Sequence, residues 1–288
     1  MKFTLSTDTV CDIFKSELTA RGIEYIPTYY TIEGVEHRDE ITRDDEIKAF
    51  YDKIRGGEMP TTSQVTQNDY EVFFADMIEK YEGDIVHITI SSGITTSPLS
   101  ARQVANEIFE KTGRRIYIVD SLAASIATRH IVDEAERLRD ADVSAEDAVA
   151  QLEDIVNHIH TWFMPTDLMH LKRGGRVSGP SAYIGTALNI KPILQFDKAG
   201  ALVVRQKKIG AGKGIAAMID IFKNTSAAEP HKVYIASADS DLAETMLKKA
   251  QAARPDCEIE VAWIGPVIGS HTGVNAVGIS FLSDSVRE

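Results

Sequence analysis

Short apolar runs alternate with longer segments of helical character along the first half of the chain. Strands are predicted where β-branched and aromatic residues cluster, at residues 3–5, 23–32, 85–90 and 116–119. Helices are predicted at residues 10–21, 42–55, 68–81 and 97–111, with two more between 122 and 160. Because the strands are largely apolar and separated by helices, they indicate a parallel sheet with helices on both faces.

Local signals mark where several of these helices begin and end. Thr42 and Ser144 stand at N-cap positions, and Ser97 followed by Pro98 provides a cap and a first-turn proline. Gly22 follows the first predicted helix, where glycine commonly ends a helix. These residues support the predicted boundaries independently of the apolar pattern.

The pattern changes from about residue 161. Residues 191–196 and 201–205 predict two paired strands joined by a turn at 197–200. A second α/β unit is completed by two helices and two strands, at residues 213–223, 241–253, 233–236 and 258–264. We therefore expect two α/β domains: a Rossmann-like domain at 1–160 with a mostly parallel, helix-covered sheet, and a second domain at 161–288.

Acidic side chains outnumber basic ones. The 288 residues include 31 basic and 43 acidic side chains, giving a net charge of -12, which disfavours binding to nucleic acid or to an anionic membrane surface. No run approaches the ~18 apolar residues of a membrane span, and no signal-peptide pattern follows Lys2. Cys11 and Cys257 lie far apart and form no metal-binding pattern. We expect a cytoplasmic protein without a metal site.

Four short strings rich in hydroxyl groups or glycine carry the candidate chemistry. They are Thr-Thr-Ser-Gln at 61–64, Ser-Ser-Gly-Ile-Thr at 91–95, Arg-Gly-Gly-Arg at 173–176 and Gly-Ser-His-Thr-Gly at 269–273. The second and fourth follow strand-like runs, and ligands of open α/β sheets bind at the carboxyl ends of strands. The strings supply neutral donors suited to a small anion. The predicted ligand-binding residues are Thr62, Ser63, Ser92, Gly93, Thr95, Ser270, His271 and Thr272.

Two other classes of function stay open from the residues alone. A hydrolase or phosphotransferase would use His271 with Ser270 or Asp120, but the chain has neither a nucleophile elbow nor a complete phosphate-binding loop. A regulatory module would sense a small carboxylate and signal through the loop at 173–176. Basic residues around this loop and Arg205 indicate either a solvated surface or a docking patch for an acidic or phosphate-bearing partner.

Seven segments, in order and across essentially the whole chain, resemble the DegV family of bacterial fatty-acid-binding proteins. They lie at residues 6–9, 60–64, 91–97, 119–121, 171–178, 191–194 and 265–273. The chain departs from the family pattern at Thr96, where the family has glycine, and at Val274 and Asn275, which replace a Pro-Gly pair.

The resemblance implies a non-catalytic protein that binds a long-chain fatty acid between two α/β domains and needs no other cofactor. The carboxylate would lie near Thr62, Ser92, Thr95 and His271, with the tail in an apolar tunnel. It also implies a partner, an ATP-dependent fatty acid kinase subunit that converts the bound lipid to an acyl phosphate. Family resemblance places Arg173, Arg176 and Arg205 on the surface that meets the kinase.

Overall fold

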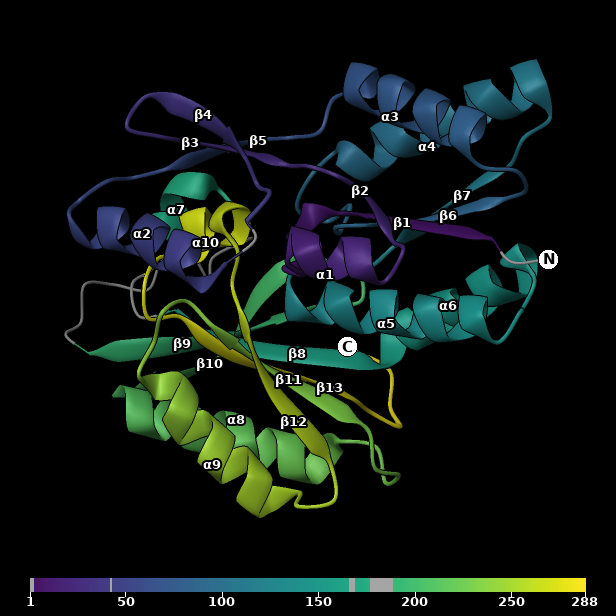
Figure 1. Ribbon diagram of the computed structural model, residues 1–288. Coiled ribbons are helices and arrows are strands. Elements are labelled where there is room, and N and C mark those ends of the chain that lie inside the picture. The colour runs from purple at the N-terminus through teal and green to yellow at the C-terminus, as the bar shows by residue number, and fades with distance from the viewer. Residues whose placement is uncertain (1–2, 42, 166–168, 177–188) are drawn as a thin grey trace.

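The computed structural model describes residues 3–41, 43–165, 169–176 and 189–288 (Figure 1). The described strands form three sheets, and the helices lie between and around them. Thr42, which the sequence predicts as an N-cap, lies outside the described residues, as do Val177 and Ser178 at the end of one family-like segment.

The first sheet is parallel and has helices on both faces, as the sequence predicts. Its strands, in order across the sheet, are β2 (Glu24–Ile26), β1 (Thr4–Asp8), β6 (Ile85–Thr89) and β7 (Ile116–Asp120). The covering helices are α3 (Gln67–Lys80) and α4 (Ser97–Thr112) on one face, and α5 (Ile126–Asp140) and α6 (Ala145–His158) on the other. Pro98 lies in the first turn of α4 and Ser144 caps α6, as expected. The N-cap of α4 is Thr96, however, and Ser97 is the first residue of the helix and not its cap.

The predicted helix at residues 10–21 is wrong in its first half. The chain forms a short 3-10 helix, η1 (Thr9–Cys11), and only then α1 (Lys15–Ala20). Asp12 separates the two because its φ of 55° is left-handed, a conformation that no α-helix continues through.

A small antiparallel sheet lies beside the first one and carries part of the predicted site. Its strands are β4 (Val35–Arg38), β3 (Tyr29–Ile32) and β5 (Thr61–Ser63), and α2 (Asp44–Arg55) connects β4 to β5. Thr62 is paired with Tyr30 in this sheet. The hydroxyl-rich string therefore has a fixed backbone instead of forming a free loop.

The second large sheet is mixed and contains every described strand from Ile159 onward. Its order is β10 (Leu202–Ile209), β9 (Ile190–Phe196), β8 (Ile159–Met164), β13 (Val277–Leu282), β11 (Lys232–Ser237) and β12 (Glu258–Trp263). The predicted pairing of residues 191–196 with 201–205 is confirmed by β9 and β10. β13 is a strand that the sequence analysis did not predict. We propose that the boundary between the two domains lies near residue 160.

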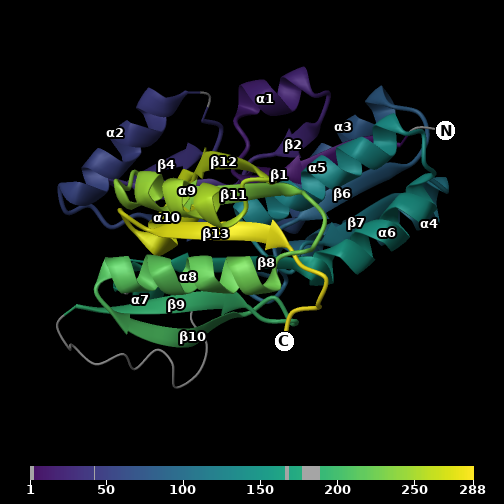
Figure 2. The same cartoon turned by 90° about the horizontal axis from the view of Figure 1, so that it is seen from below.

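Alternate residues of this sheet contact different layers. Met164, Ile193 and Ile235 pack against α8 (Ala211–Thr225) and α9 (Leu242–Ala253). Phe163 and Leu194 belong instead to the core shared with α5 and the first sheet. Figure 2 shows α8 and the mixed sheet stacked as layers beside the first domain. Both faces of the mixed sheet are therefore apolar, one toward α8 and α9 and the other toward the first domain.

Two glycine-containing strings that the sequence predicts as loops form short helices. Arg173 and Gly174 end α7 (Met169–Gly174), and residues 269–272 belong to α10 (Pro266–Thr272). Pro266 occupies the first turn of α10, where its fixed φ suits a helix start. α10 packs on α7 and on β5, so it lies where the two domains meet.

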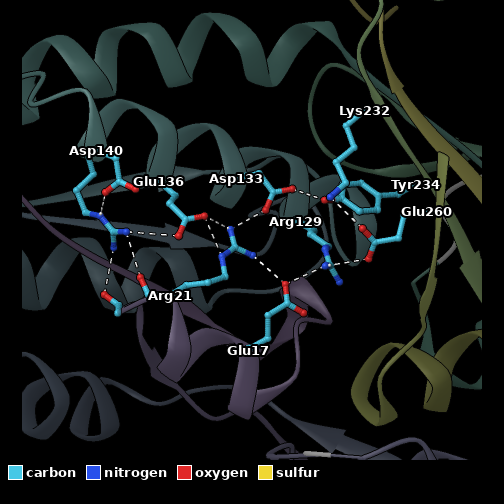
Figure 3. Close-up of polar contacts among 11 residues, drawn as sticks. Glu17, Arg21, Arg129, Asp133, Glu136, Asp140, Lys232, Tyr234 and Glu260 are labelled. Carbon is cyan, nitrogen blue, oxygen red and sulfur yellow. Dashed lines mark hydrogen bonds and ion pairs between the residues drawn. The ribbon is translucent and has the colours of Figure 1, made fainter. Parts of the chain in front are cut away.

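A polar network also joins the two domains (Figure 3). The Arg129 guanidinium of α5 lies 2.9 Å from Glu17 and 3.1 Å from Glu260, and it stacks over Tyr234 with its carbon 4.9 Å from the ring centre. Glu17 comes from α1, whereas Tyr234 and Glu260 come from β11 and β12. The hydroxyl of Tyr234 donates in turn to Asp133. One cation thus joins elements of both domains.

Candidate functional site

An apolar cavity lies between the two domains. Its walls include the turn after β6, the start of α5, helices α7 and α10, and several strands of the mixed sheet. The main apolar contributors are Ile94, Ala124, Ile126, Phe163, Leu171, Phe196, Leu202, Ala236, Ile264 and Ile268. Such walls favour a hydrocarbon ligand. Burying hydrocarbon against them removes apolar surface from water and leaves no polar group without a hydrogen bond.

A second, polar cavity adjoins the apolar one. Ile94, Ile268, His271 and Arg176 line both, so the two spaces meet along these side chains. Four of the predicted ligand-binding residues line the polar cavity, together with further polar groups: Thr62, Ser63, Thr95 and His271, with Thr28, Gln64 and Ser97. The site therefore has one apolar and one hydroxyl-rich compartment.

Thr62 and His271 are in direct contact although 209 residues separate them. Thr62 Oγ1 lies 2.9 Å from His271 Nε2. The opposite nitrogen, Nδ1, is buried, has no hydrogen-bond partner among the described residues, and faces the backbone of Gly174. A proton on Nδ1 would lack an acceptor, so we assign the proton to Nε2, from which it is donated to Thr62. The Thr62 hydroxyl then keeps its own hydrogen for an anion.

His271 is a neutral group at physiological pH. Its burial, the Arg176 guanidinium and His170 together lower its pKa to about 4. Arg176 therefore lies close enough to affect the pKa of the His271 ring. Among the described residues that line the polar cavity, Arg176 is the one with a charged side chain. An anion in this cavity would meet neutral donors and one guanidinium.

The turn after β6 has its shape fixed by a close backbone contact. The α-carbon of Gly93 faces the hairpin turn between β9 and β10, where a Cβ atom would lie 2.4 Å from Gly200 C and 2.6 Å from Ala199 O. Ser91 reinforces the contact by donating to Gly200 O at 2.8 Å and accepting from Gly93 N at 2.9 Å. Glycine is required here for space, and the contact ties the candidate site to the second domain.

The remaining predicted residues divide between an outer groove and the interior. Ser92, Gly93 and Thr95 line a solvent-facing groove that also includes Thr96 and Gly175. Thr96 donates to Gln64, which links the turn after β6 to the segment after β5. Thr96, which stands where the family has glycine, thus has a hydrogen-bond partner for its hydroxyl group.

α10 presents its hydroxyl groups differently from the sequence expectation of a ligand loop. Ser270 donates to Pro266 O at 2.7 Å, so its hydroxyl is engaged within the helix. Thr272 lines the apolar cavity and not the polar one, and its buried oxygen has no hydrogen-bond partner among the described residues. His271 is the member of the string that reaches the polar cavity.

The three arginines expected on a docking surface lie in different surroundings. Arg176 lines both cavities and the outer groove. Arg173 lies on the exposed side of α7. Arg205 lies at a register shift in β10, where it donates to Gln195 and to the carbonyl of Glu288. The sequence analysis did not place Arg176 beside the predicted ligand-binding residues, because no local pattern connects residue 176 with β5.

The buried carboxyl group of Asp39 supports the helix that carries His271. Val267 N, in the first turn of α10, donates to Asp39 Oδ2 at 3.4 Å. Burial, and to a smaller extent the nearby Asp8, raise the pKa of Asp39 from 3.8 to about 7. The folded protein therefore keeps a proton on Asp39 over a range of pH in which the unfolded chain has lost it.

This difference predicts a pH effect on stability. Between pH 4 and 7 the native state holds more protons at Asp39 than the unfolded state, so this group's stabilising contribution falls as pH rises. Asp39→Asn does not ionise, and we expect its free energy of unfolding to fall less from pH 4.5 to pH 7.5 than that of the unchanged protein. Urea titrations of both proteins at the two pH values measure the difference. Equal pH dependence would contradict the raised pKa.

No group of three or more His, Cys, Asp or Glu side chains is arranged to hold a metal ion among the residues that the structure describes. Within the same ranges, every helix is too short or too polar to cross a membrane.

Comparison with known proteins gives consistent matches over the whole chain. The family model described as "Uncharacterised protein, DegV family" matches residues 2–284. A DegV domain-containing protein of Clostridium perfringens is 32% identical over 287 residues, covering 99% of this chain and 98% of that protein. The protein DegV of Bacillus subtilis is 29% identical over 283 residues, covering 97% and 98%.

Solved structures agree with the sequence matches. The crystal structure of DegV from Bacillus subtilis, described as a fatty acid binding protein, superposes with a TM-score of 0.86 at 28% identity, covering 99% of this chain and 100% of that one. A DegV family protein from Thermus thermophilus, whose structure concerns fatty acid binding, gives a TM-score of 0.87 at 28% identity, covering 98% and 100%.

Proposed function

The chain belongs to the DegV family, and on this premise we propose that it binds a long-chain fatty acid. The observation that carries the proposal is the junction of the apolar cavity with the polar cavity along Ile94, Ile268 and His271. A molecule with a hydrocarbon tail and one anionic end matches this pair of spaces. The Bacillus subtilis and Thermus thermophilus relatives, which are described as binding fatty acids, support the same ligand class.

The tail supplies most of the affinity. Each buried methylene contributes about 0.8 kcal/mol, so about sixteen methylenes contribute on the order of 13 kcal/mol before the entropy costs of binding. The apolar walls of the cavity give no hydrogen bond that would fix the tail lengthwise. Orientation therefore depends on the carboxylate.

We place the carboxylate in the polar cavity, against the Thr62 hydroxyl. His271 donates to Thr62 and so directs the remaining Thr62 hydrogen toward the anion. Thr95 and Ser63 line the same cavity and supply further hydroxyl donors, while Arg176 offsets the charge. Neutral donors hold a carboxylate without burying a fully desolvated ion pair, which is costly. Thr272 would contact the part of the lipid that lies in the apolar cavity.

We further propose that the protein presents the carboxylate to an ATP-dependent kinase subunit and does not itself catalyse a reaction. Ser92, Gly93 and Thr95 line the outer groove, which leads from the polar cavity to solvent. Arg173 and Arg205 are exposed basic side chains available to a partner. The kinase, and a cytoplasmic location for the pair, are carried over from the family resemblance.

Mass spectrometry of the purified protein, native and after solvent extraction, tests the ligand. We expect one long-chain fatty acid per chain, with retention lowered about tenfold or more by Thr62→Val and by His271→Ala. The first change removes a donor to the anion, and the second removes the side chain that orients this donor. Thr19→Val serves as the control, because Thr19 lies on α1 and lines none of these cavities.

Two results would count against the proposal. A protein that carries no fatty acid and takes none up would exclude the ligand class and favour a small carboxylate or an enzyme substrate. Unchanged retention in both site variants would leave the ligand in place and remove the carboxylate assignment.

A further inference from the structure

A third cavity lies at the start of α10, next to the segments that lead into α1 and α2. Among the described residues, it shares no lining residue with the apolar or the polar cavity. We call it the aspartate cavity, because Asp12 and Asp39 line it. Its volume of about 20 Å³ leaves room for one group of the size of a water molecule.

One oxygen of the Asp12 carboxyl group is left without a hydrogen bond. Asp12 is 8% exposed, and its Oδ2 accepts from the hydroxyl of Ser125 at the start of α5. The other oxygen, Oδ1, is buried and has no hydrogen-bond partner among the residues that the structure describes. Burial raises the pKa of Asp12 well above 3.8, and the nearby Gly265 amide opposes this rise without a hydrogen bond of ordinary geometry to Oδ1. Oδ1 is therefore the atom that a ligand in the cavity would satisfy.

Asp39 brings a second buried carboxyl group to the same place. It is 5% exposed, and its Oδ2 accepts from Val267 N at 3.4 Å. A Cβ atom at Gly265 would lie 2.6 Å from Asp12 Oδ1 and 3.5 Å from Asp39 Oδ2, so both carboxyl groups lie beside this residue. A larger residue at 265 would collide with Asp12, whereas glycine lets the chain that enters α10 approach both groups.

The basic side chains around this cavity are engaged with other partners. Lys15 lines the cavity, and its ammonium group lies 3.5 Å from Glu40. Arg129, whose charge also acts on Asp12, pairs with two other carboxylates. Buried carboxyl groups in proteins are paired with a cation, coordinate a metal ion, or hold a proton. Asp12 and Asp39 can therefore carry either protons or a shared cation.

We propose that the aspartate cavity binds one monovalent metal ion, Na⁺ or K⁺, between Asp12 and Asp39. Carboxylate oxygens are ligands that hard metal ions prefer. A single ion fits the volume, gives the buried Oδ1 a partner and cancels the repulsion between two negative charges. Ca²⁺ takes about six to eight oxygen ligands, and the described residues contain no group of three or more side chains arranged for a metal, so a monovalent ion is the better match.

The ion acts on the helix that carries His271. Asp39 contacts the first turn of α10, and both carboxyl groups lie beside Gly265, where the chain enters that helix. An ion held between the two carboxylates stabilises this start of α10 once their protons have been lost. The effect does not depend on which lipid the protein binds.

Thermal unfolding at pH 8 in about 150 mM NaCl, KCl or tetramethylammonium chloride tests the site. The three salts screen surface charges to the same extent, but tetramethylammonium is too large for the cavity. Asp12→Asn and Asp39→Asn each remove one carboxylate and keep the shape of the side chain. Asp76→Asn is the matched control, because Asp76 is an exposed aspartate of α3.

We expect NaCl or KCl to raise the unfolding temperature of the unchanged protein and of Asp76→Asn by about 3 °C above that in tetramethylammonium chloride. Asp12→Asn and Asp39→Asn lose this difference, and the salt that gives the larger rise identifies the ion. Equal unfolding temperatures of the unchanged protein in the three salts would overturn the inference, as would a rise that persists in both site variants. If Asp12→Asn does not fold, Asp39→Asn and the comparison of salts on the unchanged protein decide the question.

Discussion

Replacing Gly93 by alanine is expected to abolish lipid retention and to lower the free energy of unfolding by about 3 kcal/mol. The added Cβ atom would lie 2.4 Å from Gly200 C and 2.6 Å from Ala199 O. Both neighbours are backbone atoms, so no side chain can rotate away. The turn after β6 must move, and with it Ser92 and Thr95, which line the site.

Gly212→Ala is the matched control for this change. Gly212 lies in α8 with no atom within 4 Å of the position of its Cβ, and alanine is the better helix former. We expect this control to unfold at the same denaturant concentration or slightly higher. Urea titration gives the stability of both variants, and native mass spectrometry gives their lipid content. A Gly93→Ala protein that is stable and fully loaded would show that the contact with the hairpin is not needed.

Arg129→Met is expected to destabilise the protein by about 2–3 kcal/mol. The Arg129 side chain is 9% exposed, and its guanidinium contacts Glu17 and Glu260 at once. Removing the guanidinium takes one cation from each of two carboxylates. Glu17 keeps Arg21 and Glu260 keeps Lys232, and both carboxylate side chains are about a third exposed, which reduces the cost. The change also removes the stacking on Tyr234 between the two domains.

Arg137→Met, on the same helix, is the control, because it measures how much stability is lost when an exposed arginine is removed. Arg137 is 61% exposed and pairs with Glu134 three residues before it, a surface pair worth less than about 1 kcal/mol. Thermal unfolding of both variants compares the loss of the shared cation Arg129, shown in Figure 3, with the loss of the solvated Arg137. Equal unfolding temperatures would mean that Arg129 contributes no more than a surface residue.

The elements predictable from sequence are those whose pattern is local. The strand at Ile85–Thr89 and the start of α4 at Ser97 and Pro98 follow from apolar runs and capping residues. α10 was missed because glycine, serine and threonine are weak helix formers, so local preference favours a loop. Its packing on α7 and β5 supplies the stability that its composition lacks.

The site was predictable in its residue types and not in its arrangement. Hydroxyl strings after strands indicated donors for an anion, and the structure places Thr62, Ser63, Thr95 and His271 around one cavity. The contact between Thr62 and His271 joins strands and helices from opposite ends of the chain, so no spacing pattern encodes it. The position of Arg176 was likewise not predictable, because only the tertiary fold brings it to the cavity beside these residues.

The position of β13 sets an order of events during synthesis. Val277–Leu282 lies in the sheet between β8 and β11, two strands that leave the ribosome much earlier. Until β13 emerges, β8 and β11 have no common partner, and the cavity wall at Gly278 is missing. The first domain has all of its strands before β8 is made and can fold while translation continues. A nascent chain therefore completes this apolar wall late, after the other described residues that line the apolar cavity have been made. If the protein binds a lipid as proposed, we expect loading to follow the synthesis of β13.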